Sequence, residues 1–195
     1  MPSANGRRRI GILALQGDFE AHEKIVSSLG AEPREVRVPD DLKGLDALII
    51  PGGESTVMTL GIEREGLAEP LRALAAGGMP VLGTCAGMII LDRDHLDLLD
   101  VSTRRNAFGR QLHSFEADLD LAGIDGGPVH AVFIRAPWVT EYGPTVEVLG
   151  KVDEHPVAIR QGNLLAVSFH PELNGETRLH QLLLEMSDGR GPAAE

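Results

Sequence analysis

The sequence predicts a three-layer α/β fold, in which helices flank a mostly parallel central sheet and antiparallel strands are added in the second half. Two observations predict it. In the first half, short apolar runs alternate with segments of helical periodicity, which favours parallel strands joined by helices. From about residue 98 to 169, strand-like runs follow one another without a long helical pattern, which favours antiparallel strands at the sheet edge.

The first half supplies the parallel strands and their connecting helices. A helical pattern over residues 18–30 begins at a capping candidate, Asp18, and stops at Gly30, and a second pattern covers residues 66–78. Four branched apolar runs bounded by Gly, Pro or Asp are expected to be buried strands: residues 9–15, 34–38, 46–51 and 79–84.

The second half supplies shorter strands and one closing helix. The helix is expected over residues 176–186, followed by a polar tail. The strands are expected at residues 110–119, 129–137, 146–152, 156–162 and 164–169. With no internal repeat or linker, we expect a single domain over residues 1–195, with flexible tails at residues 1–8 and 188–195.

Composition narrows the function classes. The formal net charge of −11 argues against a nucleic-acid partner, which requires clustered Lys and Arg. No apolar run approaches the roughly 20 residues that a membrane-spanning helix needs, and no secretory signal is visible, so we expect no membrane association and a cytoplasmic protein. A single cysteine allows neither an intrachain disulfide nor a multi-cysteine metal site, and no cofactor or metal is expected.

The single cysteine, Cys85, stands in the stretch GTCAG between a predicted strand and a helical segment. Small residues on both sides are typical of a strand-to-helix turn that holds a nucleophile in a strained conformation and presents it at the sheet edge. The N-terminus of the following helix favours a thiolate there. The alternative is a small buried core residue, so a partnering base must be found.

The stretch SFHPEL provides a candidate base. His170 and Glu172 lie just past the end of a predicted strand, and Pro171 fixes the backbone between them. A carboxylate beside an imidazole can orient the ring and stabilise its protonated form. Because parallel strands end at one edge of a sheet, we expect Cys85, His170 and Glu172 to form a nucleophile, base and orienting group there.

The stretch PGGES can supply backbone donors for a developing oxyanion. Gly52 and Gly53 follow a predicted strand and allow close approach of backbone N–H groups to a ligand. Together with the amide of Ala86, they are expected to stabilise the negative oxygen of an acyl-transfer intermediate. The phosphate-binding pattern Gly-x-x-x-x-Gly-Lys-Ser/Thr is absent.

PGGES, GTCAG and SFHPEL, in this order, resemble the class I (triad) glutamine amidotransferases, which have a flavodoxin-like fold. Three further stretches, LALQGDFEAH, RRNAFGRQLHSFEADL and VFIRAPW, resemble one family among them, the PdxT or Pdx2 glutaminase subunits of pyridoxal 5'-phosphate synthase. The resemblance covers roughly residues 10–187. It implies that Cys85 is the nucleophile and that His170 and Glu172 complete the triad.

The resemblance also implies a substrate-binding set. Arg105 or Arg135 would meet the α-carboxylate of L-glutamine and Glu54 its ammonium group, and which arginine does so stays open. Gln16 resembles a family residue near the oxyanion site and the synthase interface, although a polar residue at a strand end is the alternative. The full set by resemblance is Gly53, Glu54, Ser55, Arg105, Ile134 and Arg135.

The activity implied by the resemblance is hydrolysis of glutamine to glutamate and ammonia through a γ-glutamyl thioester. Ammonia would pass to a synthase subunit of the PdxS or Pdx1 type in a large hetero-oligomer, for pyridoxal 5'-phosphate synthesis. Two alternatives remain: a glutaminase of another amidotransferase, such as imidazole glycerol phosphate synthase, and a non-catalytic regulatory binding module. The segment between Leu91 and Arg104 is shorter than the family commonly carries.

Overall fold

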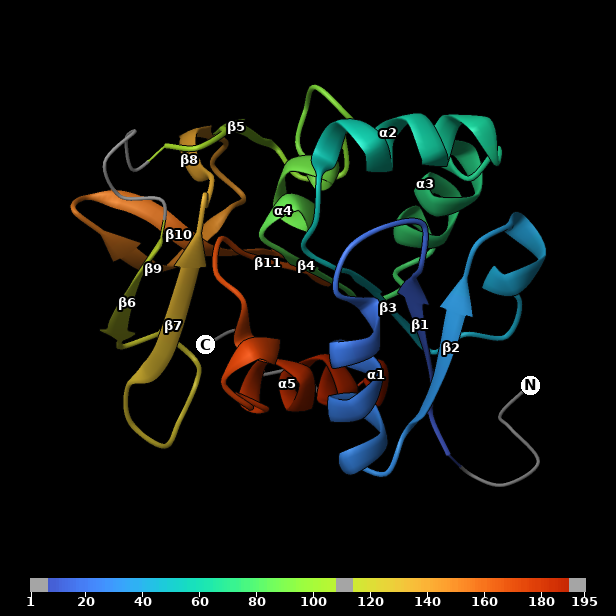
Figure 1. The fold of residues 1–195 in the computed structure, drawn as a ribbon, viewed down its shortest axis with the longest axis horizontal. Coiled ribbons are helices and arrows are strands. Elements are labelled where there is room, and N and C mark those ends of the chain that lie inside the picture. Colours follow the sequence, from blue (N-terminus) through green and yellow to red (C-terminus); the bar gives the residue numbers. More distant parts are fainter. Residues whose placement is uncertain (1–6, 108–113, 190–195) are drawn as a thin grey trace.

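The computed structural model describes residues 7–107 and 114–189, which form a central sheet with helices on both faces (Figure 1). The sheet has seven strands in the order β2-β1-β3-β4-β11-β10-β9. The pairs β1/β2, β1/β3, β3/β4 and β4/β11 are parallel, and β10 pairs antiparallel with β11 and β9. The strands are β1 Arg9–Leu13, β2 Glu32–Val36, β3 Ala47–Ile50, β4 Val81–Thr84, β9 Glu147–Val152, β10 His155–Gln161 and β11 Leu164–Val167.

The helices divide between the two faces of the sheet. In Figure 1, α1 and α5 lie together below the sheet, and α2, α3 and α4 lie above it. The α-helices are α1 Phe19–Ser28, α2 Ser55–Arg64, α3 Ala68–Ala76, α4 Ala86–Leu91 and α5 Arg178–Ser187, and short 3-10 helices are η1 Pro39–Leu42 and η2 Pro171–Leu173. None of the helices in the described ranges is both long enough and apolar enough to span a membrane.

Two hydrophobic cores form because side chains alternate along each strand. In β3, Ile49 faces the core shared with α1 and α5, and Leu48 and Ile50 face the core shared with α2, α3 and α4. All three are at most 3% exposed. Strands buried on both faces read as continuous apolar runs, which explains why the sequence reveals them.

Antiparallel strands in the second half are confirmed, but they do not all join the central sheet. β9 and β10 extend its edge, whereas β11 pairs parallel with β4 inside it. The other four form two separate ribbons: β5 Val101–Arg104 with β8 Trp138–Tyr142, and β6 Ser114–Leu119 with β7 Val129–Ile134. Phe133 in β7 packs edge-on against Phe169 beyond β11, which fixes one ribbon against the sheet end.

Several local features differ from the sequence-based expectations. The strand expected at residues 34–38 lies at Glu32–Val36, and α2 was not predicted. The buried face of α2 includes Ser55 and Gly61, so its apolar periodicity is weak. Asp18 occupies the N-cap position of α1, but its side chain makes no capping hydrogen bond.

The short segment after Leu91 is organised by one buried carboxylate. Asp92 is 1% exposed. Its Oδ1 accepts from the Asp94 amide at 3.0 Å and lies 2.7 Å from His95 Nδ1, and its Oδ2 accepts from the Thr103 hydroxyl. These bonds close the loop and lead the chain directly into β5.

The residues at the inner limits of the two expected tails contact each other. Arg8 pairs with Asp188, and its Nη1 donates to the Ser187 carbonyl at 2.8 Å. The outer parts of both tails, residues 1–6 and 190–195, lie outside the described residues, as do residues 108–113 of the stretch RRNAFGRQLHSFEADL, which include the start of the strand expected at 110–119.

The glycines around Cys85 are required by close backbone contact. A Cβ on Gly87 would lie 2.0 Å from the carbonyl oxygen of Ile50 in β3, and a Cβ on Gly83 would lie 2.9 Å from the carbonyl carbon of Gly87. Real side-chain atoms do not approach backbone so closely. The helix α4 therefore packs directly on β3 and β4 only because these positions lack side chains.

We predict that Gly87→Ala lowers the free energy of unfolding by about 2–4 kcal/mol, because backbone must shift to admit the methyl group. The matched control is Gly30→Ala, since Gly30 has a φ of 82° but open space around it. It should cost only about 1 kcal/mol, because the positive φ is then the single unfavourable feature. Chemical denaturation measures both, and an equal loss in the two variants would contradict the packing argument.

Candidate active site

Cys85 is the single residue between β4 and α4, and its backbone is strained. Its φ of 49° and ψ of −106° are conformations that non-glycine residues rarely adopt. The backbone N–H of Cys85 donates to the Val167 carbonyl at 2.8 Å, which ties this residue to the end of β11. This is the strand-to-helix turn that the sequence predicts.

The Cys85 side chain faces a pocket and is otherwise enclosed. The residue is only 7% exposed, so the expectation of a sulfur presented rather than buried needs correction. Its Sγ lies 3.8 Å from the carbonyl oxygen of Ile134 and lines a pocket of about 410 Å³. Among the described residues, the enclosed thiol is therefore open to the pocket that it lines.

His170 and Glu172 lie just after β11, where the chain leaves the central sheet. His170 precedes η2, and Pro171 and Glu172 are its first residues. The Nδ1 of His170 is 2.6 Å from Oε1 of Glu172, and their side chains are 8% and 0% exposed. A buried carboxylate at this distance fixes the ring and stabilises its protonated form.

The environment of His170 favours the imidazolium. Burial lowers the pKa of His170, but the Cys85 and Glu172 side chains, through hydrogen bonds and charge, outweigh burial and raise the pKa to about 10. A protonated imidazole beside a thiol favours the thiolate, which is the reactive form. Cys85 and His170, which are far apart in the sequence, are therefore neighbours in the fold, as the sequence predicts.

Gly52 and Gly53 pass beside these side chains. A Cβ on Gly52 would lie 2.4 Å from Cε1 of His170 and 3.4 Å from Cβ of Cys85, so only glycine fits there. Gly53 lies against Gln16, whose Oε1 accepts from the Glu54 amide at 2.6 Å. Gln16 thus connects the loop after β1 to the glycine turn. Ala86, the third predicted oxyanion residue, begins α4.

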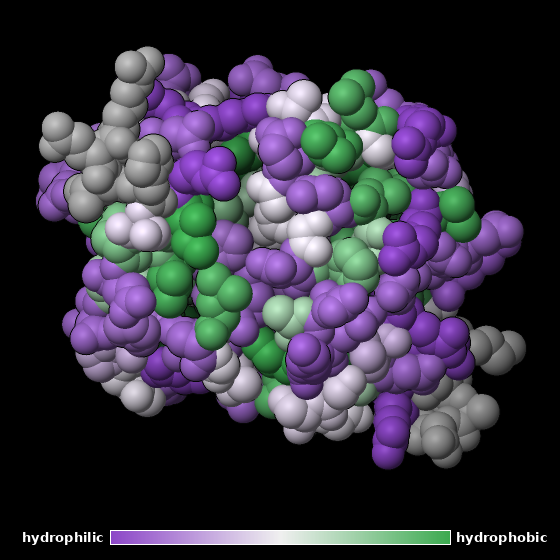
Figure 2. All heavy atoms as spheres, viewed as in Figure 1, coloured by the Kyte–Doolittle hydropathy of each residue, from purple (hydrophilic) through white to green (hydrophobic). Residues whose placement is uncertain are grey.

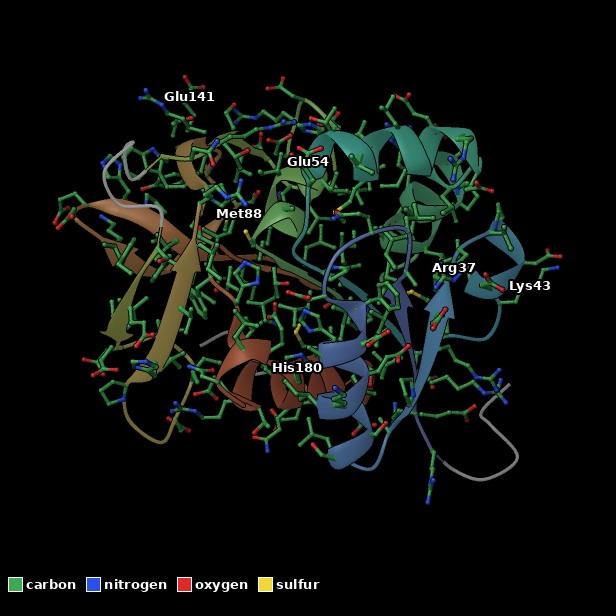
Figure 3. All side chains as sticks on the ribbon, viewed as in Figure 1. Arg37, Lys43, Glu54, Met88, Glu141 and His180 are labelled. Carbon is green, nitrogen blue, oxygen red and sulfur yellow. The ribbon has the colours of Figure 1, made fainter. Side chains whose placement is uncertain are left out.

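The charged residues of the pocket come from several elements. Glu54 caps α2: its carboxylate accepts from the amides of Val57 and Thr56, and these bonds lower its pKa. Figure 3 shows Glu54 at the start of α2. Arg105 donates from Nη1 to the Thr56 hydroxyl at 2.9 Å. Arg135, with a φ of 45°, lines the same pocket from the end of β7.

The pocket gathers most of the residues that the sequence singled out. Glu172 lies behind His170, and Gly52 lies between His170 and Cys85. The predicted residues that line the pocket are Gln16, Gly53, Glu54, Ser55, Cys85, Ala86, Arg105, Ile134, Arg135 and His170. Those not predicted are Asp18, Ile89, Asn106 and Pro137.

Asp18 is the most notable addition. A carboxylate oxygen of Asp18 and side-chain atoms of His170 and Glu172 lie within 4.8 Å of one another, close enough to share a cation. However, Nδ1 of His170 and Oε1 of Glu172 already bond each other, and we assign this pair to acid–base chemistry. The sequence pattern predicts only a capping role for Asp18, because an acidic residue just before a helix usually caps it.

The arrangement suits acyl transfer. A thiol, a protonated imidazole with its carboxylate and a close-packed glycine turn meet beside a pocket with charges of both signs. Nucleophile, proton carrier and backbone donors are the groups needed to attack a carbonyl and release its leaving group.

The sequence matches the SNO glutamine amidotransferase family over residues 12–188. A pyridoxal 5'-phosphate synthase subunit PdxT from Frankia alni is 53% identical over 194 residues, covering 94% of this chain and 98% of the relative. The PdxT subunit from Mycolicibacterium vanbaalenii is 53% identical over 188 residues, covering 90% and 96%.

Solved structures agree with the fold. A crystal structure described as a glutamine amidotransferase superposes with a TM-score of 0.87 at 44% identity, covering 92% of this chain and 98% of that one. PurLQS from Thermotoga maritima superposes with a TM-score of 0.68 at 17% identity, covering 94% and 98%, which shows a shared fold alone.

We predict that the raised pKa of His170 makes stability fall with pH. The folded protein holds a proton on His170 that the unfolded chain loses near its ordinary pKa of 6.5, so this stabilisation is complete below pH 6.5 and disappears as pH rises towards about 10. The melting temperature should therefore fall more steeply between pH 7 and 10 in the wild type than in His170→Gln. Parallel slopes in thermal melts would show that His170 is not the group responsible.

Proposed function

This chain belongs to the SNO glutamine amidotransferase family, and from this premise we propose that it is the glutaminase subunit of a pyridoxal 5'-phosphate synthase. It hydrolyses L-glutamine to L-glutamate and ammonia, and the ammonia is used by a synthase subunit. The observation that carries the proposal is that Cys85 and the His170–Glu172 pair meet beside a single charged pocket. The relatives named PdxT, 53% identical, support the choice of synthase.

Binding of glutamine places its side-chain amide against Cys85. The α-carboxylate is met by Arg105 or Arg135, which line the pocket with Ser55 and Ile134. The α-ammonium group is met by Glu54, whose lowered pKa keeps it ionised. Opposite charges at one end of the pocket orient the amide at the other.

The first chemical step is attack by the Cys85 thiolate on the amide carbon. The resulting oxyanion accepts hydrogen bonds from the backbone amides of the Gly52–Gly53 turn and of Ala86. His170, protonated and held by Glu172, donates its proton to the nitrogen as the C–N bond breaks. Ammonia leaves, and a γ-glutamyl thioester remains on Cys85.

The second step is hydrolysis of the thioester. His170, now neutral, accepts a proton from water as the water oxygen attacks the same carbon. Collapse of the second tetrahedral intermediate breaks the C–S bond, releases glutamate and restores the thiolate–imidazolium pair. This route needs no metal or cofactor, because the thiol, imidazole and backbone amides supply every group.

Apolar side chains near the pocket suit a protein partner. Val57 and Leu60, one turn apart on α2, are 49% and 60% exposed, and Ile134 and Leu173 are 37% and 47% exposed. Figure 2 shows a largely hydrophilic face on which hydrophobic residues gather over α2 and over β7. Covering these side chains would favour docking of the synthase subunit over the pocket mouth.

Replacing Cys85 by Ala tests the reaction itself. We predict that glutamine-dependent pyridoxal 5'-phosphate synthesis by the reconstituted complex falls by at least about 1,000-fold, because no thioester can form. Synthesis with supplied ammonium salt should be unchanged, which serves as the control for assembly. Undiminished glutamine-dependent synthesis would favour the non-catalytic binding module.

The partner is expected to activate the glutaminase. We predict that glutamate release rises at least about ten-fold when the synthase subunit is added, because docking aligns the oxyanion amides. Leu60→Ser should weaken this activation, and Val38→Ser, an exposed apolar residue beside η1, should not. Rapid glutamate release by the chain alone, unaffected by the partner, would contradict activation by docking.

A further inference from the structure

A buried row of polar side chains continues from the triad into the core beneath the sheet. Glu172 Oε2 lies 3.5 Å from Nε2 of His22 on α1, and both side chains are 0% exposed. Nδ1 of His22 lies 2.8 Å from Nε2 of His180 on α5. Figure 3 shows His180 where α5 packs beside α1. The reaction described above uses neither histidine.

The carboxylate of Glu172 needs a donor on its second oxygen. A buried charge is tolerated only when its oxygens receive hydrogen bonds or an opposite charge. Oε1 faces His170 at 2.6 Å, whereas no described residue makes a standard hydrogen bond to Oε2. His22 Nε2, 3.5 Å away, is therefore placed where a small approach completes the bond.

The proton of His22 can be assigned from its surroundings. Burial, and then the nearby His180 and His170, lower the pKa of His22 well below its ordinary value, so the ring is neutral and carries one N–H. A proton on Nε2 points towards Glu172 Oε2 and the Thr84 hydroxyl, 3.2 Å away. A proton on Nδ1 would instead leave a lone pair of Nε2 facing an ionised oxygen.

The proton of His180 can be assigned in the same way. Burial lowers the pKa of His180 to about 4, so it is neutral as well, and a proton on its Nε2 donates to Nδ1 of His22. The opposite assignment has His180 donating from Nδ1 towards the Glu176 carbonyl. Nδ1 of His180, however, makes no standard hydrogen bond to a described residue. The neutral carbonyl of Glu176 also attracts a proton less strongly than the full charge of Glu172 does.

We propose that His22 is a positioning residue of the reaction centre, whose neutral Nε2–H donates to Oε2 of Glu172 and holds the carboxylate so that Oε1 meets His170. His180 in turn orients the ring of His22. The assignment deepens the proposed function and rests on it for the role of the triad, but the contacts of His22 do not depend on the substrate. Helices α1 and α5 thereby support the chemistry from the opposite side of Glu172.

The chemical consequence concerns the charge of Glu172, which faces His170, His22 and, within 4.8 Å, the carboxylate of Asp18. A donor on Oε2 stabilises the carboxylate, so losing it makes the Cys85, His170 and Glu172 group take up a proton at higher pH. The thiolate form of Cys85 should then be lost at a higher pH on acidification. Packing of His22 alone would not produce such a shift.

Alkylation of Cys85 measures this directly in the full chain. Cys85 is the single cysteine, so iodoacetamide labelling followed by mass spectrometry reports on it alone and requires neither glutamine nor a partner. We expect the pH of half-maximal rate to rise by about one unit in His22→Leu. It should move by less than about 0.3 units in His22→Gln, which retains a side-chain N–H near the Nε2 position.

The matched control is His95→Gln, which removes another enclosed histidine, bonded to Asp92 and absent from the lining of the active-site pocket. Its labelling profile should match the wild type. A His22→Leu profile that superimposes on the wild type would overturn the proposal. Equal shifts in His22→Leu and His22→Gln would overturn it too, because packing and not the donor would then be responsible.

A second measurement needs no variant and covers the case in which His22→Leu does not fold. In the wild type labelled with ¹⁵N-histidine, NMR at pH 7 to 8 should show His22 neutral, with its proton on Nε2. A proton on Nδ1, or a charged ring, would overturn the assignment.

Glutaminase kinetics separate this inference from the proposed function. In the complex with the synthase subunit, His22→Leu should lower kcat about ten-fold with little change in KM, because the substrate contacts are intact. An unchanged kcat would count against the positioning role. A wild type that releases no glutamate would refute the proposed function, while alkylation and NMR would still decide the role of His22.

Discussion

The parallel pairing of β4 with β11 is the constraint on which the site depends. Their register places Thr84 opposite Val167, so the two strands end side by side although more than eighty positions separate them in the sequence. Cys85 follows one strand, and its amide bonds to the last carbonyl of the other. The chain beyond β11 then carries His170 and Glu172 to the same edge. Shifting this pairing by one residue would move the thiol and imidazole apart and reverse which face each side chain occupies.

Close backbone packing adds a second constraint at this edge. Gly87 touches β3, and Gly52 touches the ring of His170, so the turn after β4, the turn after β3 and the catalytic histidine fit together without intervening side chains. The strained backbone of Cys85 is held by these contacts and by its hydrogen bond to β11. Below the sheet, His22 and His180 extend the polar contacts of Glu172 into the core. The site is therefore built from both faces of one sheet.

Much of this was predictable from sequence, because the features involved are local. Buried strands are continuous apolar runs, and the turn around Cys85 has its own pattern of glycines. What the sequence did not reveal depends on tertiary contact. Helix α2 buries Ser55 and Gly61 and so lacks a clear apolar stripe, and β11 joins the sheet interior through a pairing that no local pattern encodes. Asp18 looks like a helix cap and His22 like an ordinary helical residue until the fold places them beside His170 and Glu172.

The most direct test of the central claim is the covalent intermediate on Cys85. Acid quenching of the complex during glutamine turnover, followed by intact-mass measurement and peptide mapping, should reveal a chain heavier by one glutamyl group, with the addition on Cys85. Replacing His170 by Ala should abolish both the adduct and glutamate release, since the proton carrier beside the sulfur is lost. Full glutamate release by His170→Ala, with no adduct on Cys85 in the wild type, would contradict the account.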